Sequence, residues 1–209
     1  MHLTQSVDAA ELDQIEREWG AAPRQHHRLQ VDHPFLTGDG QLLVSDRRRG
    51  EICYVMHRGR PDDGLLLHIK TFYPLGAFRL PTGGIHQGEG VEETLAREIT
   101  EETGLTVGKG ADTVRVQKYL GVLSYEFQHT GLQQQFDFAT YCWLVQMPIG
   151  AVLNPQDPAE QIGGWQWCGP GELIAVAEKL ESVGDSTPDW GDWGVYRGLG
   201  HRFVAAALA

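Results

Sequence analysis

The stretch GGIHQGEGVEETLAREITEETGL, residues 83–105, combines two adjacent glycines, a helical repeat and a concentration of acidic residues. Aliphatic residues recur every four positions, at Val91, Leu95 and Ile99, which predicts one apolar face of a helix. Gly104 is a natural helix stop because glycine adopts the left-handed conformation at little cost. The stretch therefore predicts a loop followed by a single helix that ends at Gly104.

Three glutamates, Glu98, Glu101 and Glu102, follow one face of this predicted helix. Residues three and four apart are neighbours on a helix surface, so their carboxylates should converge. Like charges at that spacing are destabilising, and the negative end of the helix dipole adds to the repulsion. A solvated acidic face is the simplest interpretation of these glutamates alone. Their surroundings favour a site for a hard divalent cation, with Mg²⁺ first and Mn²⁺ second.

Neighbouring residues suit such a site. Arg97 cannot ligate a cation, and its planar fork suits a bidentate bond to a carboxylate, so we expect it to orient the site. Gly83 and Gly84 have no side chain, and we expect a backbone bend there that brings a carbonyl oxygen close to the cation. A cation held in this way would also let an acidic protein bind an anionic phosphate substrate.

This stretch resembles the Nudix box at all the positions that the box specifies. In order, these are Gly83, five residues, Glu89, seven residues, Arg97-Glu98, an aliphatic residue, Thr, Glu-Glu, Thr, Gly and an aliphatic residue. This is the signature of the Nudix hydrolase superfamily, and it covers residues 83–105. The resemblance implies an α/β fold, an α/β/α sandwich with a mixed β-sheet. It also implies a hydrolase that cleaves phosphoric anhydrides by attack of water on phosphorus.

The resemblance also implies roles for individual residues. Glu98 and Glu102 would be direct metal ligands, Glu101 a ligand or a base acting through water, and Gly83 a carbonyl ligand. Glu89 would be a partner of Arg97 or an outer ligand.

The general base comes from a late loop in several subfamilies of these hydrolases. The best-placed candidate in this sequence is Glu160, with Asp157 behind it. A solvated loop carboxylate is an equally good interpretation of Glu160, because its place on a loop is the only feature that supports a catalytic role.

The rest of the chain predicts a mixed sheet. A short helix is expected over residues 9–19 and a polar loop over 20–34. Apolar runs then predict strands at 41–45, 51–58, 64–73, 113–127, 136–147 and 163–168. Further helices are expected from residue 170 or 171 to 181 and within 192–209. We expect residues 1–36 to form an N-terminal extension and residues 37–209 to form the Nudix hydrolase domain with its C-terminal helices.

The amino-acid composition argues against several classes of binding partner. The formal net charge of −11 argues against binding to nucleic acid or to an anionic membrane. No apolar run approaches the length that spans a bilayer. The 3 cysteines, Cys53, Cys142 and Cys168, have no paired spacing and predict packing residues in a reducing cytoplasm.

Substrate choice is predicted only broadly. ADP-ribose or a nucleotide sugar is favoured, because an N-terminal extension resembles the arrangement of hydrolases for those substrates, which often form homodimers. Nucleoside triphosphates and dinucleoside polyphosphates come next. A non-catalytic nucleotide-sensing domain is the alternative, although no helix-turn-helix accompanies the box. Isoprenoid diphosphate isomerisation would need additional histidine ligands and a reactive cysteine, which cannot be assigned in this sequence.

Substrate-binding residues remain unassigned by these patterns. Four aromatic residues could stack on a base, Phe72, Tyr73, Trp165 and Trp167, but aromatic residues in strand-like runs more often belong to the core. The basic run at residues 46–50 is expected to form a solvated turn rather than a phosphate grip. His86 is expected to be a loop histidine.

Overall fold

One mixed sheet of 7 strands forms the centre of the computed structural model, which describes residues 4–32, 48–131 and 133–209. The strands are β1 (Arg24–Val31), β2 (Gly50–Arg58), β3 (Leu65–Lys70), β4 (Thr82–Ile85), β5 (Arg115–His129), β6 (Gln134–Met147) and β7 (Ile162–Cys168). Their order is β1-β5-β6-β2-β3-β7, with β4 paired to β2. The pairs β1–β5 and β6–β2 are parallel and the other pairs are antiparallel.

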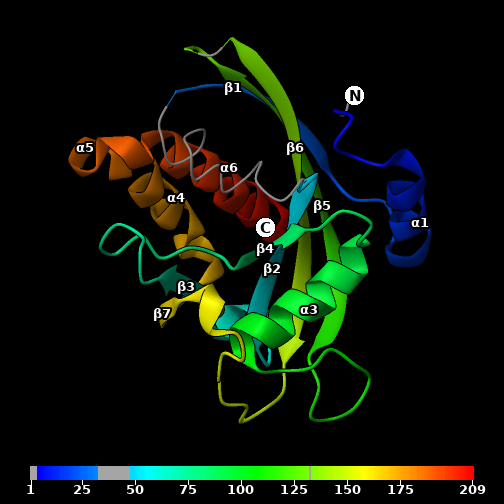
Figure 1. Ribbon diagram of the computed structural model, residues 1–209. Coiled ribbons are helices and arrows are strands. Elements are labelled where there is room, and N and C mark those ends of the chain that lie inside the picture. Colours follow the sequence, from blue (N-terminus) through cyan, green and yellow to red (C-terminus); the bar gives the residue numbers. More distant parts are fainter. Residues whose placement is uncertain (1–3, 33–47, 132) are drawn as a thin grey trace.

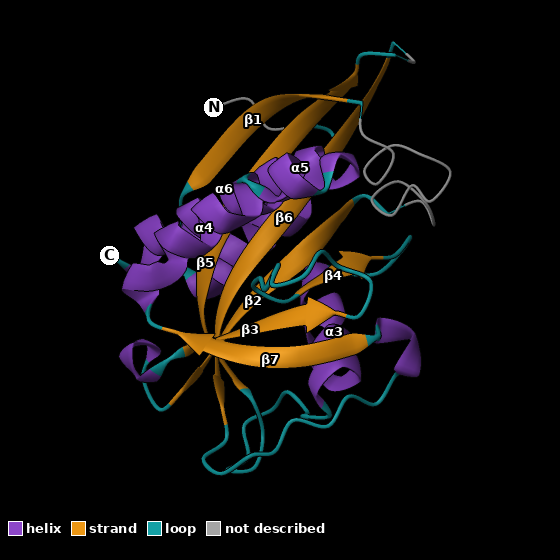
Figure 2. Cartoon of the chain, turned by 90° about the vertical axis from the view of Figure 1, so that its left-hand side faces the viewer, coloured by secondary structure: helices purple, strands orange, loops and turns teal. Residues whose placement is uncertain are grey.

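Helices cover both faces of this sheet (Figure 1). The α-helices are α1 (Ala9–Trp19), α3 (Val91–Thr103), α4 (Leu173–Glu181), α5 (Val183–Ser186) and α6 (Gly191–Leu208). Short 3-10 turns lie at Pro61–Asp63, Pro158–Glu160, Pro170–Glu172 and Pro188–Trp190. Figure 2 shows α4 and α6 lying across one face of the sheet, with α3 on the opposite side. The predicted α/β/α sandwich with a mixed sheet is confirmed.

Strand β2 explains why two layers of helices are needed. Ile52, Tyr54 and Met56 point into the core that contains the apolar face of α3. Cys53 and Val55 alternate with them and point into the core beneath α4 and α6. Successive side chains of a strand point to opposite faces, so the continuous apolar run from Ile52 to Met56 requires cover on both sides.

Most of the expected elements are present, with shifts of a few residues at their ends. All four predicted helices are present. Helix α1 corresponds to the prediction at 9–19, α3 to the helix before Gly104, α4 to the helix that ends at residue 181, and α6 to the helix within 192–209. Five of the predicted strands correspond to β2, β3, β5, β6 and β7. The strand expected at 41–45 lies outside the described residues.

The expected loop at 20–34 is wrong between Arg24 and Val31, where β1 pairs with β5 at the edge of the sheet. Its sequence is mostly polar because most of its side chains are only half-buried. Strand β4 was also not expected, since its sequence TGGI contains two glycines, which are rare in strands. The division at residues 36 and 37 lies outside the described residues and stays a prediction.

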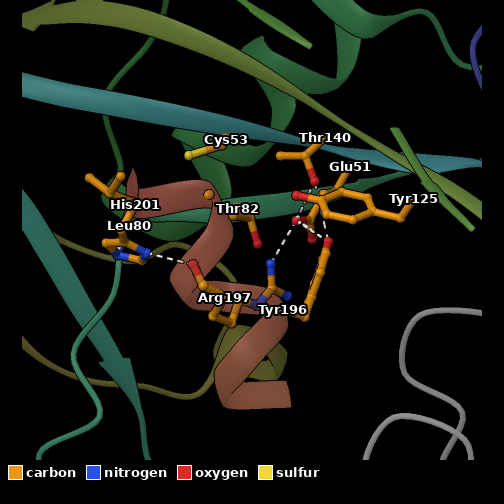
Figure 3. Close-up of a pocket in the computed structure, with 10 residues that line it drawn as sticks. Glu51, Cys53, Leu80, Thr82, Tyr125, Thr140, Tyr196, Arg197 and His201 are labelled. Atoms are coloured by element: carbon orange, nitrogen blue, oxygen red, sulfur yellow. Dashed lines mark hydrogen bonds and ion pairs between the residues drawn. The ribbon is translucent and has the colours of Figure 1, made fainter. Parts of the chain in front are cut away.

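Helix α6 is attached to β2 through a buried charged network (Figure 3). Arg197 Nη1 donates to Glu51 Oε1 at 2.6 Å, and the Tyr196 hydroxyl donates to the same oxygen at 2.6 Å. Thr140 Oγ1 on β6 donates to it at 3.1 Å. Burial raises the pKa of Glu51, but Arg197 and Tyr196 outweigh it and the net pKa is lowered, so the carboxylate is ionised.

His201 attaches the same helix to the chain that leads into β4. Its Nε2 accepts from the backbone N–H of Leu80 at 2.9 Å, and its Nδ1 lies 2.8 Å from the carbonyl oxygen of Arg197. Only the neutral tautomer with a proton on Nδ1 satisfies both contacts. Burial lowers the pKa of His201 to about 4, against the hydrogen bond to Arg197, in keeping with this neutral form.

The three cysteines are buried packing residues, as predicted. Cys53, Cys142 and Cys168 are buried and free. Within the described part of the chain, no helix has both the length and the apolar character needed to cross a bilayer.

Candidate active site and metal centre

Helix α3 starts at a glycine and receives its N-terminal cap from another helix. Gly90 at the cap position has no side chain to offer. Instead, Glu11 of α1 accepts the Val91 N–H on Oε1 at 2.9 Å. Arg49 holds the other oxygen of Glu11 at 2.6 Å and also contacts the carbonyl oxygen of Glu89 at 3.3 Å. The N-terminal segment therefore supports the helix that carries the glutamates, because its carboxylate satisfies an unpaired N–H and meets the positive helix end.

We expect Glu11→Ala to lower the free energy of unfolding by roughly 1–2 kcal/mol, since loss of a helix cap typically costs about that much. Urea denaturation measures the effect. Glu18→Ala is the matched control, because Glu18 lies exposed on the same helix. Equal free energies of unfolding for the two variants would contradict the capping assignment.

Arg97 links three acidic residues of the candidate site. Its guanidinium donates to both oxygens of Glu89, at 2.7 and 3.0 Å, and to Glu98 and Glu101 at 2.8 and 2.7 Å. It also donates to the carbonyl oxygen of Gly84 at 2.9 Å. Burial raises the pKa of Glu89, but the hydrogen bonds from Arg97 outweigh it and lower this pKa to about 2.

The structure brings Glu160 to helix α3. One carboxylate oxygen each of Glu98, Glu101 and Glu160 lies within 4.8 Å of the others, an arrangement that could hold a metal ion. Glu160 reaches this position from the short turn Pro158–Glu160 before β7. Lys70, at the end of β3, donates to Glu160 Oε2 at 2.5 Å and fixes its orientation. Asp157 instead caps this turn by accepting the N–H of Ala159 at 2.8 Å.

Glu102 occupies a different environment. Its side chain is fully buried, and Tyr54 donates to its Oε2 at 2.5 Å. Its Oε1 has no hydrogen-bond partner among the described residues and lies 3.7 Å from both Lys70 Nζ and His68 Nδ1. The expected convergence on the helix surface therefore holds for Glu98 and Glu101. Glu102 lies outside the three-carboxylate group and points toward the core, where Tyr54 binds it.

Gly83 is required for space rather than for a bend. It lies in β4, and its backbone does not have the positive φ that favours glycine. A Cβ atom at this position would lie 1.9 Å from the Cδ of Glu98. The expectation of a bend at Gly83 and Gly84 is therefore wrong. The first glycine leaves room for the carboxylate of Glu98, and the second offers its carbonyl oxygen to Arg97.

The electrostatics of these carboxylates fit a divalent cation. Burial, together with the charge of Glu102, raises the pKa of Glu98 to about 8. Burial raises the pKa of Glu102 to about 7, against the opposing effects of Lys70 and Tyr54. A dication favours the ionised form of such groups, and carboxylate oxygens are the ligands that Mg²⁺ prefers. Glu102 lies close enough to influence the charge of Glu98, and its Oε1, which has no hydrogen-bond partner among the described residues, is a further acceptor beside this group.

Three residues of this site were not predicted from the sequence: Tyr54, His68 and Lys70. They belong to β2 and β3, and their side chains meet Glu102 only after the sheet has formed. Burial, with nearby cations, lowers the pKa of His68 far below its usual value, so this ring is neutral. The sequence offered one signal, a lysine that follows a buried apolar run in β3.

A protein-family model described as NUDIX domain matches residues 27–190. The chain belongs to the Nudix family, and it is a hydrolase that acts on phosphoric anhydrides. No match was found among curated protein sequences.

Several solved structures are similar to this chain. An Ap4A hydrolase from C. elegans, in a binary complex, has 17% identity and a TM-score of 0.46, with 64% of this chain and 90% of that chain covered. The dihydroneopterin triphosphate pyrophosphohydrolase of E. coli has 14% identity and a TM-score of 0.44, with 65% and 92% covered. A MutT protein from Methanosarcina mazei has 15% identity and a TM-score of 0.41, with 60% and 80% covered.

Proposed function

We propose that this protein is a Mg²⁺-dependent pyrophosphohydrolase that cleaves the diphosphate linkage of a nucleoside diphosphate joined to another moiety. The observation that carries this proposal is the group formed by Glu98, Glu101 and Glu160, whose carboxylate oxygens lie within 4.8 Å of one another. Arg97 orients two of these carboxylates, and Lys70 orients the third.

When bound, the cation would neutralise charge on the phosphates and would lower the pKa of the attacking water. Glu98 and Glu101 would hold it, with Glu102 as a further carboxylate beside them. Arg97 keeps Glu98 and Glu101 in place through charge-assisted hydrogen bonds.

Glu160 is the proposed general base. Its Oε2 is held by Lys70, and no described residue donates to its Oε1, which can therefore accept a proton from water. The side chain of Glu160 is 20% exposed, so water reaches it, whereas Glu98 is almost completely buried. A base must lie within hydrogen-bond reach of the proton that it removes.

The proposed substrate class includes several nucleoside diphosphate derivatives. ADP-ribose and nucleotide sugars come first because of the N-terminal extension, with nucleoside triphosphates and dinucleoside polyphosphates next. A homodimer stays a prediction. The three buried free cysteines support a reducing compartment such as the cytoplasm.

A substrate panel tests the function. The purified protein is incubated with ADP-ribose, nucleotide sugars, nucleoside triphosphates and dinucleoside polyphosphates, with and without Mg²⁺, and release of nucleoside monophosphate or phosphate is measured. We expect Mg²⁺-dependent turnover with a preference for one of these classes. Nucleotide binding without turnover of any substrate would instead support the nucleotide-sensing alternative.

A further inference from the structure

A cavity opens directly beside the candidate active site. It lies between the chain that joins β3 to β4 and the first turns of α6, and its lining includes Lys70, Phe72, Gly84 and Trp193. Two of these residues also belong to the catalytic site. Lys70 binds Glu160, and the carbonyl oxygen of Gly84 binds Arg97. A substrate whose diphosphate lies at the carboxylates can therefore extend into this cavity.

One wall of the cavity is aromatic. Phe72 packs edge-on against Tyr73, with ring centroids 5.0 Å apart, and Tyr73 contacts Trp193 at 4.9 Å. Arg79 fixes the Tyr73 hydroxyl by donating to it from Nε and Nη2, at 3.1 and 2.7 Å. Phe72 is 41% exposed, so part of its ring surface is available for a base to stack on, while Tyr73 supports the ring from the side.

The other aromatic candidates are already covered. Trp165 stacks on His68, with ring centroids 6.0 Å apart. The guanidinium carbon of Arg58 lies 3.7 Å from the centre of the Trp167 ring. Neither tryptophan lines this cavity. Among these aromatic residues, Phe72 therefore best combines exposure with a position beside the site.

A carboxylate also lines this cavity. Glu51 is 4% exposed and ionised, and its three hydrogen bonds all end on Oε1. No described residue donates to its Oε2. A buried carboxylate oxygen is stabilised by a donor, and the hydroxyl groups of a ribose are donors of the right kind.

We propose that this cavity binds the nucleoside half of the substrate, with the base stacked on Phe72 and the ribose hydroxyls directed toward Glu51. This inference rests on the proposed function, because it takes the substrate to be a nucleoside diphosphate derivative. Stacking accepts any base, since every base has a π face, so Phe72 would strengthen nucleoside binding with little choice among bases.

Two measurements on three variants test this inference. The variants are Phe72→Ala, Phe72→Trp and, as matched control, Leu75→Ala, which alters a fully exposed side chain in the same connection. Calorimetry measures the binding of AMP, GMP, CMP and UMP, with ribose 5-phosphate as a ligand without a base. Steady-state kinetics on the best substrate from the panel gives KM and kcat.

We expect Phe72→Ala to weaken binding of all four nucleotides about tenfold, in the range found when a stacking ring is removed. It should raise KM by a similar factor and leave kcat within about twofold. Phe72→Trp should retain wild-type affinity, and Leu75→Ala should change nothing. Binding of ribose 5-phosphate should be insensitive to Phe72→Ala.

Two outcomes separate the inference from the proposed function. Turnover of a nucleoside diphosphate derivative with an unchanged KM in Phe72→Ala would overturn the inference and leave the function intact. Nucleotide binding that depends on Phe72, without turnover of any anhydride, would support the cavity assignment and overturn the proposed function. Absence of nucleotide binding to the wild-type protein would also overturn the inference.

Discussion

The Glu98→Gln variant is expected to lose roughly three orders of magnitude in kcat on the best substrate. Glu98 is held by Arg97 and lies in the group with Glu101 and Glu160. Glutamine has nearly the same shape but carries no charge, so the proposed cation would lose an anionic ligand. A cation contributes several kcal/mol to stabilisation of the transition state, and each 1.36 kcal/mol changes the rate tenfold.

The same variant should be at least as stable as the wild-type protein when Mg²⁺ is absent. Burial and the charge of Glu102 disfavour the ionised form of Glu98, and a neutral amide removes that conflict. The matched control is Glu93→Gln, because Glu93 lies exposed on the same helix. The site assignment would be wrong if Glu98→Gln kept more than a tenth of the wild-type kcat, or if the control lost as much.

The second large effect concerns stability. Arg197→Met should lower the free energy of unfolding by roughly 3–5 kcal/mol, the usual range when one partner of a buried ion pair is removed. The reason is that Glu51 would remain buried and charged, with only the hydroxyls of Tyr196 and Thr140 as donors. Urea denaturation followed by circular dichroism gives the value.

A surface pair that joins α6 to α4 provides the control, since Arg202 lies on the same helix as Arg197 and Glu181 ends α4. Arg202 donates to both oxygens of Glu181, each at 2.7 Å, but their side chains are 39% and 29% exposed. Arg202→Met should therefore cost less than about 1 kcal/mol. The double variant Glu51→Gln with Arg197→Met should recover much of the loss. A cost of Arg197→Met no larger than that of Arg202→Met would show that the buried pair does not hold α6 to the sheet.

The sequence predicted the helices and strands whose apolar pattern lies within a short stretch of the chain. Helix α3 was predicted from apolar residues four positions apart and from a glycine directly after them, and the observed helix ends before Gly104 as expected. The short apolar runs predicted five strands for the same reason. Strand β1 was not predicted because an edge strand with half-buried side chains needs no apolar alternation.

The sequence indicated the carboxylates of the candidate site but neither the residues of β2 and β3 around them nor most of the geometry. The motif indicated Glu98 and Glu101, and loop position indicated Glu160, which the structure places beside them. The inward position of Glu102 depends on Tyr54 of β2, and the cap of α3 comes from a residue 80 positions away in the chain. Contacts between residues so distant in sequence leave no periodic signal, so no local pattern could have revealed them.

We propose that the acidic face of α3 works because a divalent cation occupies it. The most direct test is the rate of hydrolysis of the best substrate in excess chelator, followed by a titration with Mg²⁺. The account predicts no detectable turnover in chelator and a saturable recovery as Mg²⁺ is added. Full turnover in the presence of excess chelator would contradict it.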